Sequence, residues 1–188
     1  MTEIQQEVSE GVKERTNQPG IENLLKWLGE KDLFTAPAST KYDCACEGGL
    51  AMHSLNVYRV LRERYFEEGD SEESFAICGL LHDICKADTY QQSFRNVKND
   101  ATGKWERVSC YIKKDPLPMG HGEKSVYLIQ KYMQLTDREA MAIRWHMGFT
   151  DSAAKDSLRF VSEAFAYDPL VYELHAADMR ASLKEEKR

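Results

Sequence analysis

An adjacent histidine and aspartate follow a strongly apolar run in the segment Phe75-Ala76-Ile77-Cys78-Gly79-Leu80-Leu81-His82-Asp83-Ile84-Cys85-Lys86. The apolar positions recur at helical spacing, which predicts one helix that begins behind a cap of Asp70 and Glu73 and ends at Lys86. A helix that is apolar on most of its sides belongs near the middle of a bundle, because a neighbour must cover each apolar side. We therefore expect the bundle to carry the polar pair His82-Asp83 into its interior.

Helical patterns also extend over most of the chain on both sides of this segment. Apolar spacing predicts helices over residues 3–16, 21–28, 49–66, 122–133, 137–145 and 168–183, with a weaker segment over 153–165. His53 lies on the inward stripe of its helix, and Thr136 with Glu139 predicts a capping box. Residues 33–47 have the mixed polar composition of a connecting loop. The predicted fold class is all-α, a helical bundle in a single domain of 188 residues.

The pattern changes between residues 89 and 115. Two β-favouring runs, 94–98 and 105–112, flank a five-residue loop with turn-forming chemistry, which predicts one small β-hairpin inserted into the bundle. Residues 89–115 hold six basic and three acidic side chains, a balance of +3, whereas the whole chain carries −6. The rest of the chain therefore carries −9, and the charge balance of the hairpin is locally inverted.

Composition and charge limit the class of protein. Hydrophobic residues make up 42% and charged residues 30% of the chain, as is typical of globular proteins. The longest run without Asp, Glu, Lys or Arg spans residues 48–58, too short for a membrane-spanning helix, and residues 1–7 do not resemble a leader peptide. Five cysteines without a repeating framework fit a reducing compartment. We expect a cytoplasmic protein without a membrane partner, and the negative net charge disfavours binding of long nucleic acids.

Five histidines lie at the ends or on the inner faces of separate predicted helices: His53, His82, His121, His146 and His175. A single histidine on an apolar helix face is usually a core residue whose ring is satisfied by hydrogen bonds. Several imidazoles and carboxylates buried together are different, because every unpaired polar group costs several kcal/mol. A shared cation satisfies all of these groups at once, so the residue types and their distribution favour a metal site.

The order of these residues resembles that of a known family. Its motifs here are Gly49-Leu50-Ala51-Met52-His53, Leu80-Leu81-His82-Asp83-Ile84-Cys85-Lys86, Gly120-His121-Gly122, Trp145-His146 and Ala177-Asp178. The order His, His-Asp, His, His, Asp is similar to that of the HD-domain superfamily of metal-dependent phosphohydrolases, in its dinuclear branch. The resemblance implies an HD-domain-like helical bundle, with residues 1–47 as an N-terminal helical framework and loop, 49–182 as the metal-binding core and 89–115 as the hairpin insertion.

The resemblance also implies a site for two divalent transition-metal ions. In such a site one ion is held by His53, His82, Asp83 and Asp178, the second is held by His121 and His146, and Asp83 bridges the two. Imidazole and carboxylate ligands suit Mn, Fe, Co, Ni and Zn, so the identity of the metal stays open. Two cations bridged in this way can polarise a phosphoryl oxygen and lower the pKa of a water.

The function implied is a metal-dependent phosphohydrolase that cleaves a phosphomonoester or phosphodiester of a small, nucleotide-like substrate. Asp83 and Lys86 are the candidate catalytic residues. Lys86 follows His82 by four residues and is placed to hold a substrate phosphate, although a lysine at a helix end is also commonly just solvated.

Further candidate residues come from the hairpin and the later helices. Arg95 and Lys98 are candidate contacts to the substrate phosphate, and Arg144 is either an anion contact or a surface residue. His175 precedes Asp178 by three residues, so it either orients that aspartate from behind the ligands or only packs.

Other functions stay open at this point. Similar ligand sets in the same superfamily, with a lysine shortly after the His-Asp pair, support di-iron oxygenases. A nucleotide-binding module without hydrolytic activity and an exonuclease are further alternatives. The hairpin keeps a short oligonucleotide open as a substrate, with Tyr90, Phe94, Trp105 or Tyr111 as stacking partners for a base. The sequence does not indicate the oligomeric state.

Overall fold

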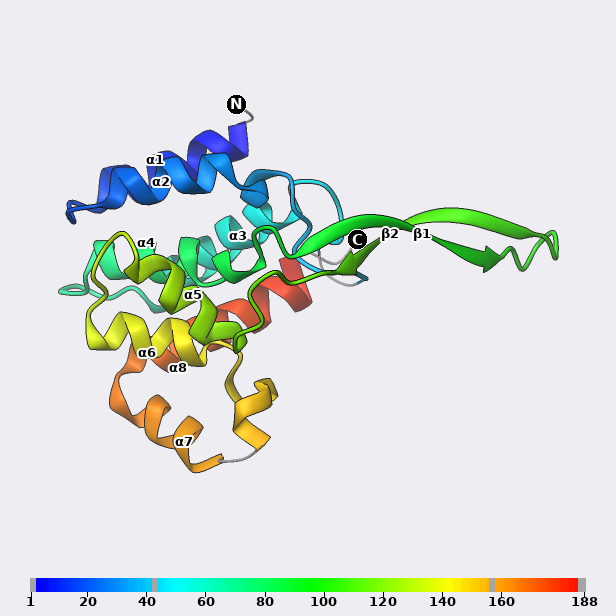
Figure 1. Cartoon of the computed structure of the whole chain (residues 1–188). Coiled ribbons are helices and arrows are strands. Elements are labelled where there is room, and N and C mark those ends of the chain that lie inside the picture. The colour runs from blue at the N-terminus through cyan, green and yellow to red at the C-terminus, as the bar shows by residue number, and fades with distance from the viewer. Residues whose placement is uncertain (1–2, 42–43, 156–157, 186–188) are drawn as a thin grey trace.

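The computed structural model describes residues 3–41, 44–155 and 158–185. These residues form a helical bundle with one antiparallel hairpin (Figure 1), which confirms the all-α prediction with a β-hairpin insertion. The helices are α1 (Glu3–Arg15), α2 (Ile21–Glu30), α3 (Gly49–Tyr65), α4 (Glu72–Leu81), α5 (His121–Gln130), α6 (Asp137–Trp145), α7 (Leu158–Tyr167) and α8 (Pro169–Arg180), and the strands are β1 (Tyr90–Lys98) and β2 (Trp105–Lys113). None of the helices in these residues is long and apolar enough to cross a membrane.

Helix α4 lies at the centre of the core. Every residue from Ser74 to Leu81 is buried, and α1, α3 and α6 pack against this helix. Its apolar side chains therefore meet a neighbour on several sides, as the sequence predicts. Helix α8 packs against both α3 and α6, which brings the C-terminal part of the chain to the same core.

Glycine 79 sets the distance between α3 and α4. A Cβ atom at Gly79 would lie 2.7 Å from the Cα atom of Tyr58 in α3, closer than side-chain atoms approach a backbone. The two helices therefore touch through their backbones at this point. This contact brings the C-terminal end of α4 close to α3, so that the rings of His53 and His82 lie with centroids 5.3 Å apart.

The prediction for the two ends of α4 is wrong. The helix is capped by Ser71, whose hydroxyl accepts a hydrogen bond from the backbone N–H of Ser74, whereas the Asp70 side chain accepts from the N–H of Glu67 in the preceding turn. At its other end the helix stops at Leu81, and a short 3-10 turn follows over Ile84–Lys86. Nδ1 of the His82 ring donates a hydrogen bond to the carbonyl oxygen of Gly79. A continuing α-helix would need this oxygen as the acceptor for the N–H of Asp83.

The predicted capping box at the start of α6 is confirmed. The Thr136 side chain accepts from the N–H of Glu139, and the Glu139 carboxylate accepts from the N–H of Thr136. Glu139 also accepts a hydrogen bond of 2.7 Å from the hydroxyl of Ser74 in α4. Of the weaker helical segment predicted over 153–165, residues 153–155 belong to a 3-10 turn, Ser152–Lys155, and 158–165 belong to α7, while 156 and 157 lie outside the described residues.

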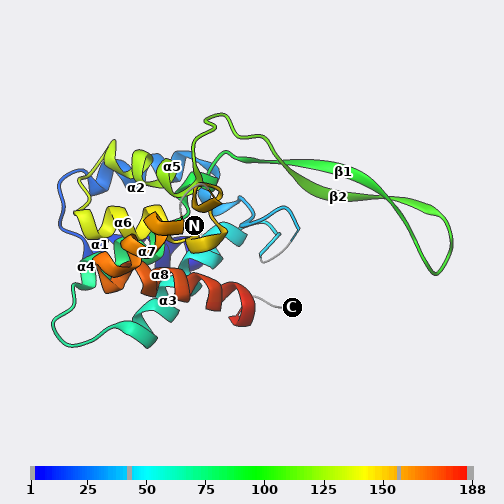
Figure 2. The same cartoon turned by 90° about the horizontal axis from the view of Figure 1, so that it is seen from below.

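The hairpin projects away from the bundle in both views (Figure 1 and Figure 2). Its strands pair from Tyr90 opposite Lys113 to Lys98 opposite Trp105, so β1 begins four residues before the predicted run. The predicted loop is confirmed: the Asn99 side chain accepts hydrogen bonds from the N–H groups of Ala101 and Thr102. Every residue of both strands is exposed or half-buried, because no element among the described residues covers the outer part of the hairpin.

The close approach at Gly79 predicts opposite effects for two glycine-to-alanine substitutions. Gly79→Ala should lower the free energy of unfolding by about 1–3 kcal/mol, because the new methyl group must push α3 away from α4. Gly29→Ala is the matched control: nothing lies within 4 Å of a Cβ atom there, so the better helix former should raise stability by up to about 1 kcal/mol. Urea unfolding followed by circular dichroism measures both, and a Gly79→Ala protein as stable as the wild type contradicts the packing described.

Candidate metal centre

The six predicted ligands come together in the core from separate elements. His53 lies in α3, His82 and Asp83 follow the last residue of α4, His121 begins α5, His146 follows α6, and Asp178 lies in α8. Their ligand atoms form three groups in which all atoms lie within 4.8 Å of one another: His53, His82 and Asp83; His82, His146 and Asp178; and Asp83, His121 and His146. The groups share members, so they form one continuous cluster.

The carboxylate of Asp83 lies at the middle of this cluster. Its Oδ1 atom lies 2.8 Å from Nε2 of His121 and 3.5 Å from Nε2 of His146. Its Oδ2 atom lies 3.5 Å from Nε2 of His53 and 3.6 Å from Nε2 of His82. Each oxygen therefore faces a different pair of imidazoles, which is the arrangement that a carboxylate needs in order to bridge two cations.

Hydrogen bonds to the backbone fix the orientation of two of the imidazoles. Nδ1 of His82 lies 3.0 Å from the carbonyl oxygen of Gly79, and Nδ1 of His146 lies 2.7 Å from that of Ile143. A carbonyl oxygen only accepts, so Nδ1 of each ring carries the proton and donates it. The Nε2 atom of each ring then presents a lone pair toward Asp83, as in metal-ligating histidines held by a backbone carbonyl.

Two buried polar atoms at the centre of the cluster lack hydrogen-bond partners. Among the described residues, neither Oδ1 of Asp83 nor Nε2 of His146 has a hydrogen bond of acceptable geometry, and both are buried. Nε2 of His82 lies only 3.4 Å from Nε2 of His53. A buried carboxylate oxygen and a buried imidazole nitrogen without partners cost several kcal/mol unless a cation lies between them. The donor set of nitrogen and oxygen atoms therefore fits divalent transition-metal ions.

The protonation states in the cluster also suit metal binding. Burial lowers the pKa of His82 to about 3, so its ring is neutral at neutral pH. Burial alone would raise the pKa of Asp83, but Lys86 and the neighbouring imidazoles hold it well below its usual value. Burial opposes ionisation of Asp178 in the same way, and its contact of 3.2 Å with Nε2 of His53 outweighs this and lowers its pKa. Both carboxylates are thus charged and ready to bind a cation.

Lys86 lies directly beside the cluster. Its Nζ atom is 2.6 Å from Oδ2 of Asp83, and its side chain is 20% exposed. Burial would lower the pKa of Lys86, but the charge of Asp83 raises it above its ordinary value. The prediction that Lys86 follows His82 along one continuous helix is wrong, since residues 84–86 form a 3-10 turn. The side chain nevertheless reaches the position beside the ligands that the sequence predicts for it.

A pocket opens beside Lys86 and His121, between α5 and the base of the hairpin. It has a volume of ≈ 180 Å³, and Tyr90, Lys113 and Lys124 also line it. Lys124 is almost fully buried and donates to Asp115 and to the hydroxyl of Thr89, at 2.6 and 3.2 Å. Sequence reasoning missed Lys124, although its position three residues after His121 on one helix face is a signal that could have found it.

Three of the four candidate contacts to substrate lie away from this pocket. Arg144 forms ion pairs with Glu123 and Asp151, so its charge is already neutralised. Arg95 lines a separate pocket of ≈ 210 Å³ with Thr40 and Lys41 of the loop before α3. Lys98 ends β1, eight residues from Tyr90, which is roughly 26 Å along an extended strand. Of the four, only Lys86 lies at the cluster.

His175 has a contact different from the one the sequence suggests. Its Nδ1 atom lies 2.6 Å from the carbonyl oxygen of His146, and its ring packs against Phe165. The ring therefore fixes the chain at His146, the ligand at the end of α6. It supports the site through this backbone contact with α6.

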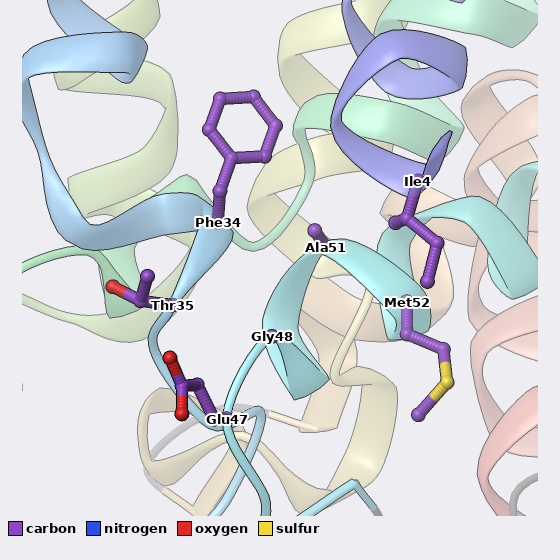
Figure 3. Close-up of a pocket in the computed structure, with 7 residues that line it drawn as sticks. All are labelled: Ile4, Phe34, Thr35, Glu47, Gly48, Ala51 and Met52. Atoms are coloured by element: carbon purple, nitrogen blue, oxygen red, sulfur yellow. The ribbon is translucent and has the colours of Figure 1, made fainter. Parts of the chain in front are cut away.

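A larger pocket lies at the start of α3 and has no role in this cluster. Its volume is ≈ 400 Å³, and its lining consists of Ile4, Phe34, Thr35, Glu47, Gly48, Ala51 and Met52 (Figure 3). Among the lining residues, Glu47 alone carries a charge, and none of the six ligands reaches this pocket. The six ligands therefore lie apart from this pocket, whereas His121 lines the smaller one.

Comparison with known proteins gives the family. The family model described as HD domain matches residues 50–181. No curated protein and no solved structure matches the chain. The match covers more than half of the chain and contains all six residues of the cluster. This chain belongs to the HD-domain family.

Proposed function

We propose that this protein hydrolyses a phosphomonoester or phosphodiester of a small, nucleotide-like substrate with the help of two divalent transition-metal ions. HD domains are in general metal-dependent hydrolases. The observation that carries the proposal is the Asp83 carboxylate, each oxygen of which faces a separate pair of imidazole nitrogens.

The ligands divide between two cations. One cation would be held by His53, His82, Asp83 and Asp178, and the second by His121 and His146 with Asp83 in common. When bound, these cations supply a polarised phosphoryl oxygen and a water of lowered pKa. The neutral ring of His82 and the ionised carboxylates of Asp83 and Asp178 at neutral pH support this assignment, because a proton on any of the three would compete with the metal.

Lys86 is the residue of the chain that is placed to hold the substrate. Its ammonium group lies beside Asp83 and also lines the pocket next to His121. Its raised pKa keeps it charged at neutral pH, so it acts as a fixed positive charge for a phosphate and not as a base. The pocket volume of ≈ 180 Å³ is below that of typical small-molecule sites, which suits the phosphate end of a substrate whose remainder extends outward.

The metal centre predicts the metal content of the purified protein. The wild type should carry about two transition-metal ions per chain, and Asp83→Asn should lose both, because the bridging carboxylate is shared. Asp88→Asn is the matched control: this aspartate is exposed and its φ of 55° suits asparagine. Elemental analysis with circular dichroism measures the result. A folded wild type that neither retains nor takes up transition metal contradicts the assignment.

The role of Lys86 predicts a specific loss of phosphatase activity. With Mn²⁺, Co²⁺ or Ni²⁺ present, the wild type should release phosphate from a panel of nucleoside phosphates and sugar phosphates. Lys86→Ala should lower kcat/KM by about a hundredfold, since a charged contact to the substrate is lost. The exposed Lys26→Ala is the control and should behave like the wild type.

Metal content should stay unchanged in Lys86→Ala, which shows that the loss of activity lies in substrate contact and not in the metal site.

A parallel measurement separates hydrolysis from oxidation. Oxygen uptake by the iron-loaded, reduced protein is measured in parallel with phosphate release. Oxygen uptake without phosphate release from any substrate of the panel overturns the proposal in favour of an oxygenase.

A further inference from the structure

The register of the hairpin sorts its side chains onto two faces. Residues directly opposite each other in an antiparallel pair share a face, and the faces alternate along each strand. One face contains the pair Tyr90 and Lys113 at the base and the pair Lys98 and Trp105 at the tip. We call this the aromatic-basic face, and its members are Tyr90, Gln92, Phe94, Asn96 and Lys98 of β1 with Trp105, Arg107, Ser109, Tyr111 and Lys113 of β2.

The aromatic-basic face combines exposed rings with positive charge. It holds four aromatic and three basic side chains and no acidic one, while Glu106 lies on the opposite face. Trp105 is 71% and Phe94 is 55% exposed. The guanidinium of Arg107 lies 4.3 Å from the centre of the Phe94 ring, which shows that both occupy this face. Large exposed rings in a row are uncommon on a surface without a binding role.

This face is continuous with the pocket at the metal centre. Tyr90 and Lys113, its first pair, line that pocket together with Lys86 and His121. From there the face follows the hairpin outward, away from the bundle (Figure 2). Nine residues of extended strand span about 30 Å. A ligand on this face can therefore place one end at the metal ligands while the rest lies along the hairpin.

We propose that the aromatic-basic face binds single-stranded nucleic acid and leads one phosphodiester of that strand to the metal centre. Aromatic rings stack on unpaired bases of any sequence, and basic side chains between them contact the phosphates. A mononucleotide would occupy only the pocket and leave the outer rings unused. A duplex would keep its bases stacked on one another and away from the rings.

Binding to the face is independent of the proposed function, whereas cleavage rests on it. In the cleavage step, the oxygen of a water forms a bond to phosphorus and one P–O ester bond breaks. A proton passes from the water to the departing sugar oxygen, so that the products are a phosphate end and a hydroxyl end.

The test measures binding of a fluorescein-labelled oligothymidylate of twelve nucleotides by fluorescence anisotropy. Trp105→Ala and Phe94→Ala should each weaken binding by between about fivefold and a hundredfold, as expected for the loss of one stacked base. Val97→Ala changes an exposed side chain of the opposite face and should leave Kd within twofold. With three phosphate contacts, raising the salt from 50 to 200 mM should weaken binding about twentyfold. A duplex of the same length should bind at least tenfold more weakly.

Further variants separate this proposal from its alternatives. Arg107→Ala should weaken binding more than Lys104→Ala, which removes a positive charge from the exposed loop of the hairpin, outside the face; equal effects mean diffuse attraction and overturn the proposal. Asp83→Asn should still bind the oligonucleotide, because the face does not need the metal. Phosphate release from mononucleotides without oligonucleotide binding refutes this inference and leaves the proposed function intact. Sedimentation that shows dimers dissociated by Trp105→Ala, without oligonucleotide binding, assigns the face to a second copy instead.

Discussion

The side chain of Asp83 is only 2% exposed, and its carboxylate lies among the Nε2 atoms of four imidazoles. The rest of the structure depends on how this negative charge is compensated. An isolated buried carboxylate costs several kcal/mol even after relaxation of its surroundings. Lys86 compensates part of this charge from one side. His82 and His146 donate their Nδ1 protons in hydrogen bonds to backbone carbonyls, so the Nε2 atom of each neutral ring has no proton to donate to Asp83. The cluster is therefore built for cations, and a bundle without them carries an electrostatic cost at its centre.

Gly79 connects this site to the packing of the bundle. Without a side chain, it lets α4 lie against the backbone of α3 at Tyr58, which brings His82 toward His53. Its carbonyl oxygen also accepts a hydrogen bond from Nδ1–H of His82. One residue thus sets both the distance between two ligand-bearing helices and the tautomer of one ligand. The break in α4 follows from the same hydrogen bond, since a ring that takes this carbonyl removes an acceptor from the next helical turn.

The bundle and the ligand set could be predicted because both leave a pattern in the order of residues along the chain. Helical periodicity located α6 to the residue, and the order of His82, Asp83 and their partners resembles that of a known family, which implied one shared site. Local competition for hydrogen bonds was not predictable, so the end of α4 and the cap at Ser71 were missed. Pairing between residues apart in sequence was also not predictable: the sequence left Arg144 as either an anion contact or a surface residue, whereas the structure pairs it with Glu123 and Asp151.

Positive and negative side chains are unevenly distributed along the chain, so the net charge of −6 does not describe the charge that an anionic ligand meets at the hairpin. At physiological salt, charges more than about 8 Å apart in solvent are largely screened from each other. A phosphate on the outer part of the hairpin, which projects from the bundle (Figure 1), therefore encounters mainly the basic side chains of the hairpin. At the pocket Lys124 is paired with Asp115, and Lys86 and Lys113 place further positive charge beside the two carboxylates of the cluster. A negative net charge disfavours an anionic ligand only when the surface charges are evenly mixed. In this molecule they are not, because a basic hairpin is inserted beside the site.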